Sequence, residues 1–397
     1  MAPTVREVLD TAAYFPQEIE RLLDRKRPSF IDFDPELGYV LRDYIFRDGM
    51  EGTLSAYTYE PHGGHRKMIN CAGQPCRINT YGDSFTQCAQ VSNGETWQEV
   101  LAAHFREPIR NFGVGGYGVY QAYRCALRIE VTDLAAEYVI LNIWDDDHFR
   151  NIDAARWIRV AWAFKGLPRG GGEDTYPVHG FPWGHLRYDL KVGEFVELPG
   201  ACKVAEDLRK LADKDYYYNL FKDDEVARLY VLTLGGEAPL DGLKELAEAF
   251  GLRLDLRDAS RRQQDARKLH VAYGLRSTMY IIDQLKAFCA KHGRKLMVLL
   301  SYDTPSVRTM IKQGTRFDQE LVDYLQRGGL PWVDCLAKAA EEYKAFRLSP
   351  DEFLERHYIG RAGAQVFGHY NPAGNVWFAY AIRKELVDWL NPKPPAY

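Results

Sequence analysis

Two segments of the chain alternate short apolar runs with amphipathic stretches, and this alternation constrains the possible fold more than any other feature of the sequence. In the first segment the pattern predicts strands and helices in turn, at 77–81, 95–105, 108–112, 120–131 and 137–144. In the second it predicts a helix first and then strands and helices in turn, at 275–292, 295–301, 317–326, 332–335 and 372–390. Strands that are joined through helices run parallel, so we expect an α/β fold with a central parallel sheet.

The alternation is interrupted between residues 147 and 268, over a stretch that is too long for an ordinary connecting loop. This stretch has a strand-like run at 186–198 and helical runs at 204–211 and 240–250, and we interpret it as an inserted lid or cap. Residues 1–75 are rich in aromatic side chains and loops, and we interpret them as an N-terminal extension. The main domain is then expected to comprise residues 76–146 and 269–397.

Composition and charge exclude several classes of protein. The chain has 397 residues, of which 46% are hydrophobic, and its net charge is −4 without a long basic block, so nucleic acid is not an expected partner. The first 23 residues carry charges among their apolar positions, and no run is long enough to span a membrane, so we expect a cytoplasmic protein. The seven cysteines are scattered, without the spacing of metal ligands, and are expected to be reduced. The sequence leaves the oligomeric state open.

The tripeptide Gly-Asp-Ser at 82–84 ends the first predicted strand of the alternating region. Open α/β sheets place their functional sites at the carboxyl ends of the strands, where Ser84 would be held. Ser84 is therefore a candidate nucleophile. The alternative is that Asp83 and Ser84 only cap the helix that follows.

Two further segments are predicted to reach the same edge of the sheet. Residues 113–118 form a glycine-rich turn after the next strand, and its backbone N–H groups, Gly116 in particular, are candidates for stabilising an oxyanion. The alternative is a tight connection that simply needs glycine. His369 directly precedes the last predicted helix, and from there it could act as the general base for Ser84.

These three segments resemble sequence blocks of the SGNH (GDSL) hydrolase superfamily, in the order expected for that family. They are Tyr-Gly-Asp-Ser-Phe-Thr at 81–86, Asn-Phe-Gly-Val-Gly-Gly at 111–116 and His-Tyr-Asn-Pro-Ala-Gly at 369–374. The resemblance implies a three-layer flavodoxin-like fold and an esterase without metal or organic cofactor. It implies that Ser84 attacks an acyl carbon, that His369 takes its proton, and that the N–H groups of Ser84 and Gly116 hold the oxyanion.

The sequence departs from the family pattern at two places. The third block of the family carries an asparagine that donates to the oxyanion, whereas this chain has Asp145, Asp146 and Asp147, and a carboxylate donates only when it is protonated. Three residues before the histidine the family has an aspartate, and this chain has Val366. Either the pair works as a Ser-His dyad, or another carboxylate orients His369. Asp145, Asp146 and Asp147 are candidates, and the alternative for them is a solvated acidic turn.

Other side chains near these motifs are candidates for binding a substrate. They are Asp83, Asn111, Tyr117, Tyr120, Trp144, His148 and Arg150. Aromatic walls suit a sugar ring, although core packing explains them equally well, and His148 and Arg150 can instead belong to an ion-paired loop. The leading hypothesis is an esterase for a small polar or carbohydrate ester. The alternatives are a glycoside hydrolase or transferase that uses the aspartates, and a non-catalytic carbohydrate-binding relative.

Overall fold

The computed structural model of the chain describes residues 2–24, 26, 29–163, 165, 180–360 and 368–397. Its internal contacts divide the chain into two compact units. The first, here called the insert unit, comprises Met1–Val40 and His148–Tyr280, and the second, the sheet unit, comprises Leu41–Asp147 and Ile281–Tyr397. The predicted N-terminal extension is thus divided between the two units. The predicted insertion corresponds to residues 148–280 of the insert unit.

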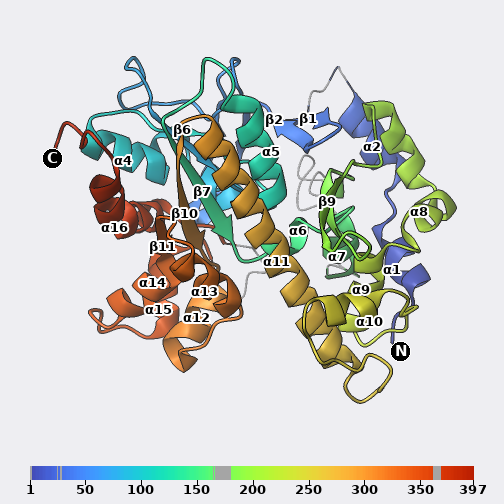
Figure 1. Ribbon diagram of the computed structural model, residues 1–397. Coiled ribbons are helices and arrows are strands. Elements are labelled where there is room, and N and C mark those ends of the chain that lie inside the picture. The colour runs from blue at the N-terminus through green and yellow to red at the C-terminus, as the bar shows by residue number, and fades with distance from the viewer. Residues whose placement is uncertain (1, 25, 27–28, 164, 166–179, 361–367) are drawn as a thin grey trace. The chain divides into compact units, whose positions relative to one another are not determined.

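The sheet unit is built on five parallel strands, so the predicted α/β fold with a parallel sheet is confirmed (Figure 1). The strands are β5 (Ile78–Tyr81), β6 (Arg110–Asn111), β7 (Tyr138–Trp144), β10 (Lys295–Ser301) and β11 (Trp332–Asp334). They lie in the order β11-β10-β7-β5-β6, so the chain leaves β5 toward β6 and then crosses back to β7. The direction of winding therefore reverses between β5 and β7, where sheets of this kind form a crevice.

The two longest central strands, β7 and β10, are mostly apolar, as expected for a sheet that helices cover on both faces. Every residue of β5 and β7 is buried. Register places Tyr81 beside Leu141 and Ser301 beside Trp144, so β5, β7 and β10 end near one another.

Helices surround this sheet and mostly follow the sequence prediction. They are α3 (Ser84–Gln87), α4 (Trp97–Phe105), α5 (Val119–Ile129), α12 (Thr304–Gln313), α13 (Gln319–Arg327), α14 (Cys335–Tyr343), α15 (Pro350–His357) and α16 (Pro372–Trp389). Helix α5 packs on β5 and β7, α14 packs on β10, and α4 packs on α16. The prediction did not include α12, α14 and α15. Their N-caps Asp303, Asp334 and Ser349 accept hydrogen bonds from first-turn N–H groups, which is the signal that identifies such short helices.

A small antiparallel hairpin and two short 3₁₀ turns complete the sheet unit. The hairpin pairs β3 (Tyr44–Phe46) with β4 (Ser55–Tyr57), and the turns are Met50–Gly52 and Asn93–Glu95.

The insert unit is mainly helical, with two small sheets. Its helices are α1 (Val5–Ala12), α2 (Pro16–Leu23), α7 (Trp157–Ala163), the 3₁₀ helix Ala205–Ala212, α8 (Lys214–Phe221), α9 (Glu225–Thr233) and α10 (Leu243–Ala249). Its strands are β1 (Ile31–Asp34) with β2 (Gly38–Leu41), and β8 (His185–Asp189) with β9 (Glu194–Leu198). The predicted strand at 186–198 is thus an antiparallel hairpin. Two helices carry residues of both units, α6 (Asp147–Arg150) and α11 (Arg262–Lys291).

Helix α11 begins 13 residues before its predicted start at 275, and Gly274 explains the difference. Glycine lowers helix propensity by about 1 kcal/mol, so it marks an apparent boundary in the sequence. In the structure Gly274 lies inside the helix, and an added Cβ would come 3.2 Å from the carbonyl of His148. The glycine therefore allows α11 to pack closely against the backbone of residue 148.

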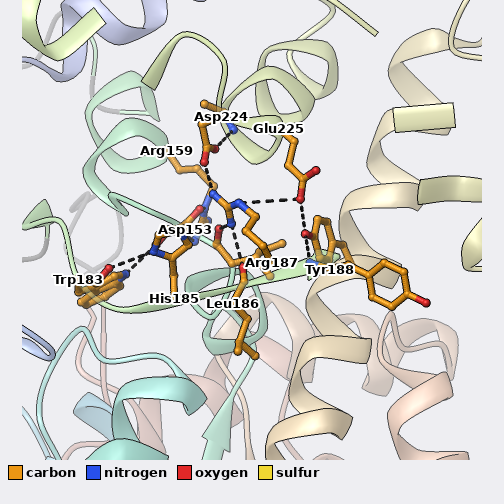
Figure 2. A network of polar contacts seen from close by, with 12 residues as sticks. Asp153, Arg159, Trp183, His185, Leu186, Arg187, Tyr188, Asp224 and Glu225 are labelled. Carbon is orange, nitrogen blue, oxygen red and sulfur yellow. Dashed lines mark hydrogen bonds and ion pairs between the residues drawn. The ribbon is translucent and has the colours of Figure 1, made fainter. Parts of the chain in front are cut away.

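A buried ionic network organises the insert unit around Arg187 of β8 (Figure 2). Its guanidinium donates to Asp224 and to the carbonyl of Ile152, and lies 3.9 Å from Glu225. Burial works against ionisation of Asp224, but Arg187 and the N–H of Ala227 hold the pKa of that carboxyl below its usual value. One guanidinium thus serves two carboxylates, and Glu225 also accepts a hydrogen bond from the hydroxyl of Tyr273.

Two findings bear on the expected cellular setting. All seven cysteines are free thiols. None of the helices in the described part of the chain combines the length and the apolar character that crossing a bilayer requires.

Candidate functional site at the edge of the sheet

Ser84 occupies the first position of α3, three residues after β5 ends at Tyr81. Asp83 is the N-cap, and its carboxylate accepts from the N–H of Phe85 at 2.8 Å. For Asp83, the capping role that the sequence left as an alternative is therefore observed. The hydroxyl of Ser84 donates to the other oxygen of Asp83 over 3.2 Å, and the residue is 7% exposed. This places a serine hydroxyl at the carboxyl edge of the sheet, where the winding direction reverses.

The glycine-rich turn after β6 lies directly against Ser84 and α3. An added Cβ on Gly113 would lie 2.1 Å from the backbone nitrogen of Gln87, and one on Gly115 would lie 3.6 Å from Cβ of Ser84. Gly116 has φ +87°, a conformation that favours glycine. The turn is thus a tight connection that needs glycine, which the sequence left as an alternative. The same close packing places the turn beside the candidate nucleophile.

Side chains of neighbouring residues hold the turn in place. Asn111 accepts from the N–H of Gly113 at 2.9 Å, and Gln87 accepts from the N–H of Gly115 at 2.8 Å. Within the described part of the chain, the N–H groups of Ser84 and Gly116 donate to no protein acceptor. These two donors are the ones for which the sequence predicts a role in binding an oxyanion.

His369 lies next to α3, in the segment that leads into α16. Its ring packs on Phe85, the residue after Ser84, with centroids 5.2 Å apart. Its backbone N–H and its ring Nδ1 both lie 2.8 Å from Oε1 of Gln90. Asn371 then caps α16 by accepting from the N–H of Gly374. The fold therefore brings the candidate base to the helix that begins with the candidate nucleophile.

The structure places an amide oxygen, that of Gln90, against Nδ1 of His369, whereas the sequence left open either a Ser-His dyad or a carboxylate from the acidic run. Asp145 accepts from the N–H of Asp303 at 3.0 Å and from the hydroxyl of Ser306. Asp147 accepts from the N–H of Trp144 at 2.9 Å. These contacts fit the alternative of a turn that closes β7, with the qualification that Asp145 and Asp147 are buried rather than solvated.

Burial, followed by the charge of Asp303, raises the pKa of Asp145 well above its usual value. A carboxyl with a raised folded-state pKa contributes stability at low pH, and this contribution is lost as the pH rises through that pKa. Asp145→Asn keeps the shape and removes the titration. We therefore expect the variant to have a higher free energy of unfolding than the wild type at pH 8, and the difference to vanish at or below about pH 4, near the ordinary aspartate pKa.

Urea unfolding at both pH values measures the difference. Asp207→Asn is a control of opposite sign, because a hydrogen bond from Lys210 and two backbone N–H groups lower the pKa of Asp207 to about 2. A loss of stability in Asp145→Asn at pH 8 would show that Asp145 is ionised in the folded protein.

The remaining candidates lie in two places. Tyr117, Tyr120 and Trp144 are buried in the sheet unit, and Trp144 stacks on Phe85 with an interplanar angle of 15°. His148 and Arg150 belong to the insert unit, where Nδ1 of His148 lies 2.8 Å from the hydroxyl of Thr278. Their predicted contact with a substrate stays a prediction. Val366 lies outside the described residues.

Three residues that no sequence motif identified complete the site. Gln90 contacts His369, Gln87 holds the glycine turn, and Arg66 holds the loop between them by donating to the carbonyls of Gln87, Cys88 and Val91. Only the closeness of Gln87 and Gln90 to Ser84 in the sequence could have drawn attention to them. Comparison of the chain with protein-family models and with curated proteins finds no match.

Proposed function

We propose that the chain is a serine hydrolase of the SGNH type that cleaves a small polar ester, with Ser84 as nucleophile and His369 as base. The observation that carries the proposal is the meeting of three elements at one point. Ser84 begins α3, the glycine-rich turn that contains Gly116 packs against α3 and Ser84, and His369 packs on the next residue, Phe85. The strand order, 2-1-3-4-5 when counted within the sheet, is that of flavodoxin-like folds and supports the same assignment.

The proposed reaction is acyl transfer in two steps. The hydroxyl of Ser84 turns from Asp83 toward His369, Oγ attacks the acyl carbon, and its proton passes to Nε2 of the imidazole. The N–H groups of Ser84 and Gly116 stabilise the oxyanion, and the imidazolium returns its proton to the departing alkoxide. Water then repeats the sequence on the acyl-enzyme and releases the acid.

The walls of the site suggest the class of substrate. Trp144 and Phe85 are buried and stack on each other with centroids 5.3 Å apart, so in the proposal they form the apolar support beneath the site. Asp83 and the acidic residues after β7 provide polar groups at the same edge of the sheet. We therefore include O-acylated carbohydrates among the proposed substrates. The seven free thiols fit a reducing compartment, so a cytoplasmic location is part of the proposal.

Labelling with a fluorophosphonate tests the nucleophile directly, because such probes modify activated serines. We expect stoichiometric labelling of the wild-type protein, with the modified peptide located at Ser84 by mass spectrometry. Ser260→Ala, which removes an exposed serine of the insert unit, is a matched control that should label fully. Absence of labelling, or labelling elsewhere, in a protein that hydrolyses p-nitrophenyl acetate would contradict the assignment.

A further inference from the structure

We infer that Gln90 is the positioning residue for His369, with a neutral amide oxygen in the place that a carboxylate has in Ser-His-Asp triads. The inference deepens the proposed function and rests on it. It starts from two distances to one atom: Oε1 of Gln90 lies 2.8 Å from the backbone nitrogen of His369 and 2.8 Å from Nδ1 of its ring.

The backbone contact fixes which way the amide of Gln90 faces. The oxygen and nitrogen of a glutamine amide are ordinarily distinguished only through their partners. Here one partner is a backbone N–H, which can only donate, so the atom that faces it must be the accepting oxygen Oε1.

The orientation of the amide in turn fixes the tautomer of the imidazole. Oε1 has no hydrogen, so Nδ1 of His369 must carry the proton and donate it. In the neutral ring Nε2 then carries no hydrogen and can accept a proton, which is the form a general base needs. An aspartate would select the same tautomer and would also stabilise the imidazolium. The amide selects the tautomer without adding a charge.

The backbone of Gln90 is held in a conformation that aims its side chain at His369. Gln90 has φ +70°, which is uncommon for a residue other than glycine, and it is 7% exposed. Its N–H donates to the hydroxyl of Tyr57, which donates to Asp48 at 2.9 Å. Such strained positions persist only where the surroundings determine them.

A buried arginine, Arg66, holds the loop around Gln90 in this conformation. Arg66 is 2% exposed, and its guanidinium donates to the carbonyls of Gln87, Cys88 and Val91 on both sides of Gln90. The same guanidinium lies 4.6 Å from the ring centroid of Tyr57. The loop that follows α3 is thus fixed at several points, and the position of the amide does not depend on a single bond.

Two variants separate positioning from general support of the fold. Gln90→Met keeps the length of the side chain but removes the acceptor, and we expect kcat for p-nitrophenyl acetate to fall by about 10²- to 10⁴-fold with a small change in KM. Gln90→Glu restores an acceptor and should recover at least a tenth of the wild-type kcat. Its carboxylate also stabilises the imidazolium, so the acidic limb of the pH–kcat/KM profile should move to higher pH. Gln74→Ala, at an exposed glutamine of the same unit, is the control and should match the wild type.

The tautomer gives a readout that does not depend on activity. Two-bond ¹H–¹⁵N correlations of the imidazole, with the His369 signal assigned through its loss in His369→Ala, should show a proton on Nδ1 in the wild type. In folded Gln90→Met the signal should show a mixture of tautomers. A proton on Nε2 in the wild type, or an unchanged tautomer and kcat in Gln90→Met, would overturn the role of Gln90. The expected tautomer together with failure to label Ser84 would instead overturn the proposed function.

Discussion

Ser84→Ala is expected to lower kcat/KM for p-nitrophenyl acetate by at least about 10³-fold while leaving the temperature of thermal unfolding nearly unchanged. In the proposed reaction the hydroxyl oxygen of Ser84 forms the covalent bond, and removal of a serine nucleophile leaves only the catalysis that oxyanion binding and substrate binding supply. Alanine also removes the weak 3.2 Å hydrogen bond to Asp83, which contributes about 1 kcal/mol or less. Initial rates and thermal unfolding of the same preparation measure both effects.

The matched control is Ser301→Ala. Ser301 is also a buried serine at the carboxyl end of a strand, β10, and its hydroxyl donates to the carbonyl of Ile143 at 3.3 Å. We expect this variant to retain its activity. Full activity in Ser84→Ala would rule out the serine mechanism, and cleavage of glycosides that is lost in Asp145→Asn would favour the carboxylate alternative. Sugar binding without labelling or turnover would favour a non-catalytic binding protein.

The second large effect is expected on stability, at the ionic network of the insert unit. Arg187→Met should reduce the free energy of unfolding by about 3–5 kcal/mol, because it leaves Asp224 and Glu225 without their cation in a buried setting. The side chains of Arg187 and Asp224 are only 10% and 14% exposed, so water screens the pair poorly. Chemical denaturation with far-UV circular dichroism measures the change.

Arg209→Met is the control for this prediction. Arg209 pairs with Glu20 in the same unit at 2.7 Å, but the two side chains are 48% and 58% exposed. Exposed pairs of this kind contribute about 1 kcal/mol or less. Equal destabilisation by the two variants would show that burial does not determine the strength of the network.

The parallel sheet could be predicted from the sequence because its two longest strands, β7 and β10, have nearly continuous apolar runs and the other predicted strands alternate with helical segments. The run at 138–144 is buried at every position, and such a run is typical of a strand covered on both faces. The short helices α12, α14 and α15 were missed because their apolar positions are few, and their signals are single caps such as Asp303. Gly274 concealed the first half of α11, since its role depends on packing against His148, which is distant in the sequence.

The site could be predicted only as far as its motifs extend. Ser84, the glycine turn and His369 each follow or precede an element whose position the alternation predicts. Gln90 could not be found in this way, because its contact with His369 joins residues 279 positions apart and depends on a backbone conformation that no residue pattern encodes. For Asp145 the sequence offered either a role in orienting His369 or a solvated turn, and its burial beside Asp303 depends on α12, a helix that the prediction did not include.

The paired donors of Ser84 and Gly116 also bear on where the reaction would obtain its speed. An N–H dipole that is already oriented toward the place where negative charge develops does not have to reorient during the reaction. The free-energy cost of orienting it is met during folding. If the turn at 113–116 moved away so that these N–H groups could find other acceptors, it would lose its close packing on α3. In the proposed enzyme, the N–H groups that stabilise the oxyanion would therefore be oriented before the ester binds.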